Sequence, residues 1–133
     1  MSGIKDIDSL LKYMQPELSE REYVFCSIQK PAFDLVNKLV PICIFVEDEG
    51  LSLVIEKSVA QKENFQIDKV FRKITLQVHS SLEAVGLTAA VSKSLAEAGI
   101  SANVIAAYYH DHIFVPTRKS ALAIEVLQEL SKK

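Results

Sequence analysis

The chain has 133 residues, of which 49% are hydrophobic and 24% are charged, as is ordinary for a soluble globular protein. This composition excludes an intrinsically disordered chain, a collagen-like repeat and a coiled coil. The 15 Lys and Arg residues nearly balance the 17 Asp and Glu residues. A net charge of −2 disfavours a nucleic-acid partner, which would require a basic surface.

The N-terminal residues and the two cysteines together predict a cytoplasmic protein. No apolar segment of a secretory signal follows Met1, and no apolar run reaches the length of a membrane span. Cys26 and Cys43 each lie in an apolar run, which is typical of inert buried thiols and not of a disulfide framework. We therefore expect no membrane association.

The first half of the chain predicts one helix followed by three strands. Residues 4–14 carry apolar side chains at helical spacing, and Pro16 ends the pattern. The predicted strands are residues 22–28, 42–46 and 51–56, the last two forming a hairpin across the acidic turn 47–50. Residues 30–39 match no element, and residues 58–68 are expected to hold a helical turn and a linker.

The second half predicts the order β-α-β-β-α. Its strands are expected at residues 71–79, 101–109 and 113–115, where apolar and polar or β-branched residues follow strand patterns. Gly86 precedes the first helix, and Gly99 closes it in the position that tolerates a left-handed backbone. Thr117 is expected to cap the last helix.

A ferredoxin-like β-α-β-β-α-β module needs a fourth strand after its second helix. The second half predicts no such strand, because only Ser131, Lys132 and Lys133 follow the last helix. The missing strand must therefore come from the N-terminal half or from another chain. We expect an α+β protein of two interlocked modules, residues 1–66 and residues 67–133, whose sheets share or exchange a strand.

Four segments carry a resemblance to a known family: residues 45–54 (FVEDEGLSLV), 78–91 (VHSSLEAVGLTAAV), 98–101 (AGIS) and 110–116 (HDHIFVP). They resemble segments of small bacterial proteins with tandem ACT domains. The resemblance implies two ferredoxin-like modules with antiparallel sheets and helices on one face. It also implies a function by class, since ACT domains commonly bind amino acids as regulatory ligands, whereas stand-alone proteins of this kind are functionally unassigned.

The segment 80–88, between a strand and a helix, is the first candidate binding site. A helix N-terminus offers free backbone N–H groups to a carboxylate, and Gly86 permits close approach. In ACT domains this segment forms part of the ligand site, so the resemblance implies a site here, at the junction of the two modules. The residues alone also fit a plain helix entry with Ser80 and Glu83 as a capping box. The candidate ligand-binding residues are Ser81, Gly86, Leu87, Thr88, Ala89, Asn103, Ile105 and Glu47.

Two other groups of polar residues have both a structural and a functional interpretation. The segment His110–His112, together with His79, offers imidazole nitrogens to a metal ion. A zinc site needs three or four converging ligands, however, and only the local pair is visible, so we expect structural roles and no metal. The acidic turn 47–49 is expected to be solvated, with Glu47 as a candidate acceptor for the ammonium group of a ligand.

The sequence favours a non-enzymatic regulatory module that binds an amino acid or a related carboxylate. It contains none of the motifs G-x-x-x-x-G-K-[ST], G-x-G-x-x-G, C-x-x-C or G-x-S-x-G, so we expect no enzyme activity and no cofactor. The alternatives are a structural or protein-interaction module of the same fold and a small enzyme that uses residues 110–112. Two ACT modules in one chain can pair internally, so we expect a monomer or a weak homodimer.

Overall fold

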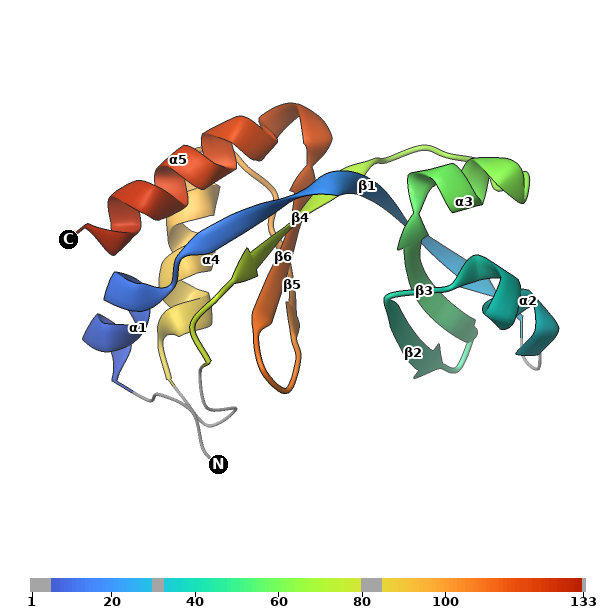
Figure 1. Cartoon of the computed structure of the whole chain (residues 1–133), viewed down its shortest axis with the longest axis horizontal. Helices are drawn as coiled ribbons and strands as arrows, with labels where there is room; N and C mark the ends of the chain where they lie inside the picture. The colour runs from blue at the N-terminus through green and yellow to red at the C-terminus, as the bar shows by residue number, and fades with distance from the viewer. Residues whose placement is uncertain (1–5, 30–32, 80–84, 133) are drawn as a thin grey trace. The chain divides into compact units, whose positions relative to one another are not determined.

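The computed structural model describes residues 6–29, 33–79 and 85–132. They form two units: the terminal unit holds the chain up to Glu20 and from Arg72 onward, and the inserted unit holds Arg21–Phe71. In chain order the elements are α1 (Ile7–Tyr13), β1 (Pro16–Ile28), α2 (Phe33–Leu39), β2 (Cys43–Glu47), β3 (Gly50–Glu56), α3 (Lys57–Lys62), β4 (Phe71–Leu76), α4 (Leu87–Glu97), β5 (Asn103–Ala106), β6 (Asp111–Pro116), the 3-10 turn η1 (Thr117–Lys119) and α5 (Ser120–Ser131) (Figure 1). No helix among these described residues is long and apolar enough to cross a membrane.

The terminal unit contains a sheet in the strand order β1-β4-β6-β5. The Gln77 N–H donates to the Met14 carbonyl at 2.6 Å, and the Arg72 guanidinium donates to the Ser19 carbonyl at 2.9 and 2.6 Å. The partner moves back from Ser19 to Met14, just before β1, as the chain moves forward from Arg72 to Gln77, just after β4, so the two strands run antiparallel. The strand that the second half lacks is therefore supplied by the N-terminal half, which is one of the two sources that the sequence left open.

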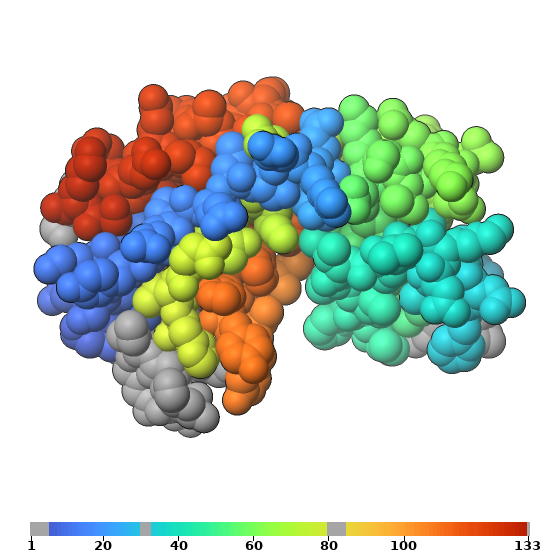
Figure 2. Space-filling view, in the orientation of Figure 1, coloured from blue at the N-terminus to red at the C-terminus, as the bar shows by residue number. Residues whose placement is uncertain are grey.

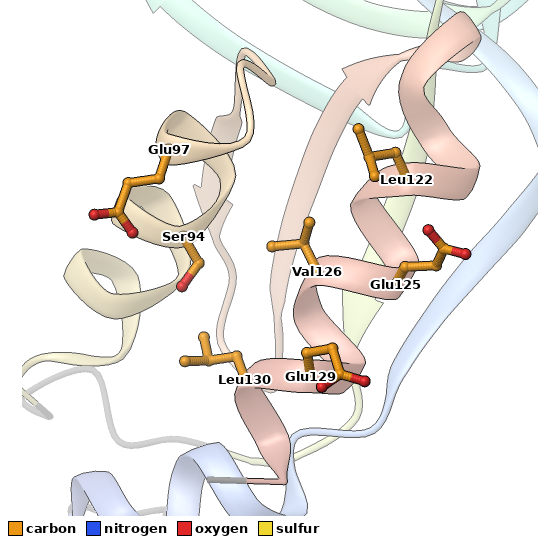
Figure 3. A pocket seen from close by; sticks show the side chains of 7 residues that line it. All are labelled: Ser94, Glu97, Leu122, Glu125, Val126, Glu129 and Leu130. Carbon is orange, nitrogen blue, oxygen red and sulfur yellow. The ribbon is translucent and has the colours of Figure 1, made fainter.

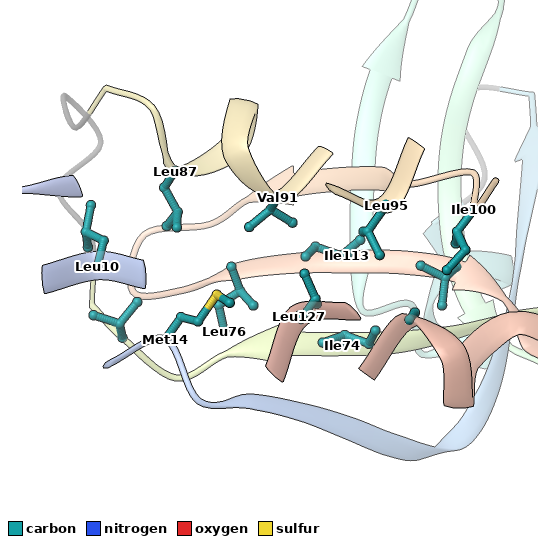
Figure 4. Packing of buried hydrophobic residues seen from close by; sticks show 13 residues of the cluster. Leu10, Met14, Ile74, Leu76, Leu87, Val91, Leu95, Ile100, Ile113 and Leu127 are labelled. Carbon is teal, nitrogen blue, oxygen red and sulfur yellow. The ribbon is translucent and has the colours of Figure 1, made fainter. Parts of the chain in front are cut away.

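One hydrophobic core holds the terminal unit together (Figure 4). The sheet and the helices α4 and α5 bury the side chains of Ile74, Leu76, Leu87, Val91, Leu95, Ile113 and Leu127. Leu10 and Met14, which precede β1, are completely buried in the same cluster. The beginning of the chain is thus bound to its end by apolar packing as well as by strand pairing.

The inserted unit is an antiparallel sheet in the order β2-β3-β1, packed with α2 and α3. The part of β1 after Glu20 pairs with β3, from Tyr23 opposite Glu56 to Ile28 opposite Leu51. The core of this unit consists of Val24, Ile28, Leu39, Leu51, Leu53, Ile55 and Ala60. Since β1 contributes residues to both units, the predicted sharing of a strand is confirmed.

The predicted hairpin of β2 and β3 has Glu47 opposite Gly50. Gly50 has a φ of +151°, and a Cβ at this position would lie 2.4 Å from the carbonyl oxygen of Ile28. Side chains do not tolerate so close an approach. Only glycine therefore lets β3 begin beside the end of β1.

The sequence predicts neither the first part of β1 nor α2. β1 begins at Pro16, six residues before the predicted strand 22–28. α2 occupies Phe33–Leu39, in the segment that matched no element. Neither segment has a clear hydrophobic periodicity, because the first part of β1 is mostly polar and α2 spans only two turns.

The predicted cap of the last helix is wrong. Thr117 does not cap α5 but begins η1, and the hydroxyl of Ser120 closes that turn by donating to the Thr117 carbonyl at 2.8 Å. Among the described residues, the buried Thr117 Oγ1 has no hydrogen-bond partner. The extra turn moves the start of α5 past the residue that the sequence placed at its N-cap.

The division of the sequence between residues 66 and 67 stays a prediction. The two units are not consecutive halves of the chain, because α1 and the first part of β1 pack with the chain from Arg72 onward.

We expect residues 67–133 alone not to fold cooperatively as a monomer. This fragment lacks β1, one of the two strands that lie beside β4. It also lacks Leu10 and Met14, and truncation of such a buried side chain to Ala typically costs about 2–5 kcal/mol. Joining residues 6–21 to its C-terminus through a flexible linker is expected to restore folding. Urea denaturation followed by circular dichroism measures both outcomes. A cooperative transition of the fragment alone would contradict the role of the shared strand.

Candidate functional site

The N-terminus of α4 is the part of the predicted site that the structure places most completely. Gly86 is its N-cap residue, with φ +105° and ψ −24°, in the left-handed region that favours glycine. A Cβ at this position would lie 3.4 Å from the side chain of Ile7, in ordinary contact. The backbone conformation, more than the lack of space, therefore explains the glycine that the sequence singled out.

The first turn of α4 has backbone N–H groups that the helix itself does not use. The Ala90 N–H donates to the Gly86 carbonyl at 2.9 Å and begins the helical ladder, so the N–H groups of residues 87–89 have no acceptor within the helix. Within the described residues no side chain caps this end, and its first turn contains no acidic residue. Leu87 is buried in the core, whereas Thr88 and Ala89 are exposed. In the described part of the chain, neither a capping side chain nor an acidic residue of the first turn thus competes with a carboxylate for this end.

The two predicted residues on β5 do not converge on this helix end. Val104 packs against the core of the terminal unit, so its neighbours Asn103 and Ile105 project from the opposite face of the strand. Asn103 donates from Nδ2 to the Phe114 carbonyl at 3.2 Å, across the β5–β6 pair. Its amide thus serves the sheet.

The remaining predicted residues lie elsewhere in the chain. Glu47 is at the end of β2 in the inserted unit, where it accepts a hydrogen bond from the hydroxyl of Ser52. Glu47, Asp48 and Glu49 are all exposed, so the acidic turn is solvated as predicted. Ser81 lies outside the described residues. Of the predicted residues that the structure describes, it therefore brings together only Gly86, Leu87, Thr88 and Ala89.

The histidines near the β5–β6 hairpin have structural partners. His112 Nδ1 lies 2.9 Å from Thr75 Oγ1, which links β6 to β4. Burial lowers the pKa of His112, and the charges of Lys73 and His110 lower it further. No group of three side chains able to bind a metal ion occurs in residues 6–29, 33–79 and 85–132. The arrangement suits a neutral imidazole that is hydrogen-bonded within the sheet.

The loop between β5 and β6 carries an aromatic cluster that the sequence analysis missed. The rings of Tyr108 and Tyr109 meet edge-on with centroids 5.0 Å apart, and the His79 ring lies 5.6 Å from Tyr109. The strand predicted to continue through Tyr109 ends at Ala106, so both tyrosines lie in the loop and are exposed. This surface can stack on an apolar or cationic group.

The two cysteines are free thiols. Cys26 on β1 and Cys43 on β2 are half-buried, so they are less enclosed than the sequence predicted. Burial raises the pKa of the Cys26 thiol, which keeps it protonated and a poor nucleophile.

A groove of about 380 Å³ runs between α4 and α5. Val126 and Leu130 project from α5 toward α4 and form its apolar floor (Figure 3). Its other lining residues are Ser94, Glu97, Leu122, Glu125 and Glu129. Because every charged side chain in this lining is acidic, the groove repels a carboxylate. The N-terminus of α4 therefore remains the better site for an anionic ligand.

Two family profiles described as the ACT domain match the chain in tandem, over residues 2–72 and residues 66–129. The chain belongs to the ACT-domain family. The tandem arrangement and the ACT fold that the sequence predicted are thereby confirmed. No curated protein matches the sequence.

The solved structures that are similar to this ACT-domain protein include proteins without an assigned function and a regulatory subunit of an enzyme. A Vibrio cholerae protein of unknown function, described as a possible transport protein, is 54% identical over 96% of each chain, with a TM-score of 0.83. The regulatory subunit of aspartate kinase from Thermus thermophilus is 10% identical over 90% of this chain and 98% of that chain, with a TM-score of 0.66. A protein from Agrobacterium tumefaciens is 15% identical over 87% of each chain, with a TM-score of 0.63. At such low identity the last two show the fold alone.

We expect the free energy of unfolding to fall as the pH is lowered through the titration range of His112. Its pKa is lower in the folded chain than the ordinary value of about 6.5, so the unfolded chain binds more protons in this range. The stabilisation from the neutral ring is full above a pH of about 6.5 and is lost as the pH falls through the lower folded-state pKa.

Replacing His112 with Gln, which can still bond to Thr75, is expected to flatten this part of the pH profile. Urea denaturation of both chains at a pH of about 7.5 and at a pH of about 5 makes the comparison. An equal loss of stability in the two chains would assign the effect to another group.

Proposed function

We propose that this ACT-domain protein binds a small amino acid or a related carboxylate as a regulatory ligand and performs no chemistry on it. The observation that carries the proposal is the N-terminus of α4, where a left-handed Gly86 leads into a first turn without a side-chain cap in the described structure. Family membership supports regulation, since a regulatory subunit of aspartate kinase shares this fold.

In this proposal the ligand carboxylate accepts hydrogen bonds from the N–H groups of residues 87–89, and the exposed Thr88 adds a hydroxyl donor. An exposed helix end favours an anion by about 0.3–1 kcal/mol, and a hydrogen bond to a charged group contributes about 1.5–3 kcal/mol. Two such bonds and the helix end together give about 3–7 kcal/mol, which corresponds to a dissociation constant between about 10 μM and a few millimolar. Ligands should therefore be sought at millimolar concentrations.

A structural or protein-interaction module without a bound metabolite is the second candidate function. The exposed ring pair of Tyr108 and Tyr109 favours it, because exposed tyrosines of this kind are common at protein interfaces. Ligand-dependent stabilisation separates the two functions.

A thermal-shift panel of the proteinogenic amino acids and common metabolic acids tests the proposed function. A ligand at about ten times its dissociation constant adds roughly 1.4 kcal/mol of stability, which raises the melting temperature of a chain of this length by a few degrees. If no compound moves the transition, the interaction module becomes the better explanation.

Replacing Ala89 with Glu is expected to remove the shift caused by a ligand found in this panel. Residue 89 is the third helical position after Gly86, where a Glu interacts favourably with the helix end, so the free protein stays folded while ligand carboxylate is repelled. Replacing Ala89 with Gln is the matched control, since it has nearly the same shape without the charge. A shift that survives in A89E, or is lost equally in A89Q, would place the ligand elsewhere.

A further inference from the structure

The groove between α4 and α5 carries an apolar stripe. Leu122, Val126 and Leu130 follow one another at four-residue spacing along α5, so they lie on one face of that helix. Leu122 is 42% exposed, and the other two are half-buried beside the core. In the space-filling view α5 (red) lies at the surface of the terminal unit (Figure 2). The stripe extends over about 12 Å of helix, which is more than two turns.

Carboxylates flank this stripe on both sides. Glu97 stands on the α4 side of the apolar side chains, and Glu125 stands on the α5 side (Figure 3). Both are exposed, and within the described residues neither forms an ion pair. Glu129, one turn further along α5, lies 3.3 Å from the ammonium group of Lys132 in an exposed ion pair, which is of a weak kind. The groove thus presents an apolar floor between negative charges.

An amphipathic helix with a basic polar face has the chemistry that matches this groove. Its apolar residues, spaced three and four apart, can lie on the stripe of α5, while its lysines or arginines reach the carboxylates on the two sides. A third helix that packs on α4 and α5 in this way buries apolar surface that water now covers. The acidic sides disfavour a helix with acidic side chains, so charge selects the partner.

A second copy of this chain does not match the groove. Two such grooves that face each other bring their acidic sides together, which is unfavourable. Among the described helices outside the groove, α1 and α2 have seven residues each and α3 has six, so each is shorter than the stripe. The anionic surface of a membrane is repelled by the same glutamates.

We propose that the groove between α4 and α5 binds a basic amphipathic helix of another protein. The groove and the candidate ligand site use different parts of α4. Gly86 and the first turn belong to the ligand site, whereas Ser94 and Glu97, toward the end of α4, line the groove. The proposal therefore does not depend on a bound amino acid.

Fluorescence anisotropy with a labelled peptide tests the proposal on the full chain. The probe is a synthetic helix of about 14 residues, made of leucine and lysine with the leucines at helical spacing. We expect it to bind, and we expect binding to weaken as the salt concentration rises. A peptide with glutamate in place of every lysine is expected not to bind. Equal binding of the two peptides, or no binding of the lysine peptide up to millimolar protein concentration, would overturn the proposal.

Two variants test whether the peptide lies in the groove. Leu122→Lys removes an apolar contact and adds a positive charge beside the basic peptide, so we expect it to weaken binding by about tenfold or more. Replacing Glu97 and Glu125 together by Gln is expected to weaken binding by about threefold to tenfold at low salt, because exposed ion pairs are individually weak. The same double replacement is expected to reduce the dependence on salt.

Replacing Asp48 by Asn and Glu49 by Gln is the matched control. It changes the net charge by the same amount as the replacement of Glu97 and Glu125, but it alters an exposed turn of the inserted unit. We expect it to leave peptide binding unchanged, and circular dichroism checks that all variants are folded.

Three results with these variants would contradict the proposal. The first is a control that weakens binding as much as the two replacements in the groove, and the second is an L122K chain that binds the peptide as the natural chain does. The third is self-association of the natural chain that L122K prevents, measured by light scattering, since it would assign the groove to a second copy. None of these outcomes bears on ligand binding at the N-terminus of α4.

Discussion

The fold depends on the backbone pairing of one strand, β1. Up to Glu20 it belongs to the terminal unit and lies beside β4, and after Glu20 it pairs with β3 in the inserted unit. Without it, β4 would lose its backbone hydrogen bonds on that side, each of which contributes about 0.5–1.5 kcal/mol. Leu10 and Met14 add an apolar anchor next to this strand. The terminal unit is therefore completed only by residues from the opposite end of the sequence.

Much of this architecture could be predicted because the strands and helices that bury one face carry strong hydrophobic periodicity. Ile74 and Leu76 alternate with polar residues along β4, and the buried face of α4 repeats at helical spacing. The first part of β1 could not be recognised in this way. It pairs on one side only, and of its residues 16–20 only Leu18 packs against the core, so its composition is that of a loop. Counting the strands that a ferredoxin-like module requires revealed its existence without locating it.

The candidate site was predictable where a backbone constraint selects the residue type. A left-handed helix entry needs glycine, so Gly86 could be identified from the sequence. Alternation could not tell which face of β5 the helices cover, because it defines two faces without assigning either to the core. Val104 packs against the core, so the side chains of its neighbours Asn103 and Ile105 lie on the face of β5 that points away from α4. Similarly, nothing in the run up to Tyr109 marks where the strand gives way to the loop.

The first part of β1 and the edge strand β2 differ in the side chains that they carry along their open edges. The first part of β1 carries a proline and charged side chains, Pro16, Glu17 and Glu20, which are the devices that keep an open edge from pairing with other chains. β2 has none of these devices between Cys43 and Val46. Its apolar side chains are not needed to complete the core either, because β3 is buried along most of its length while β2 remains largely exposed. A strand that only covered β3 could be polar, so the packing of the inserted unit does not by itself account for the apolar character of β2.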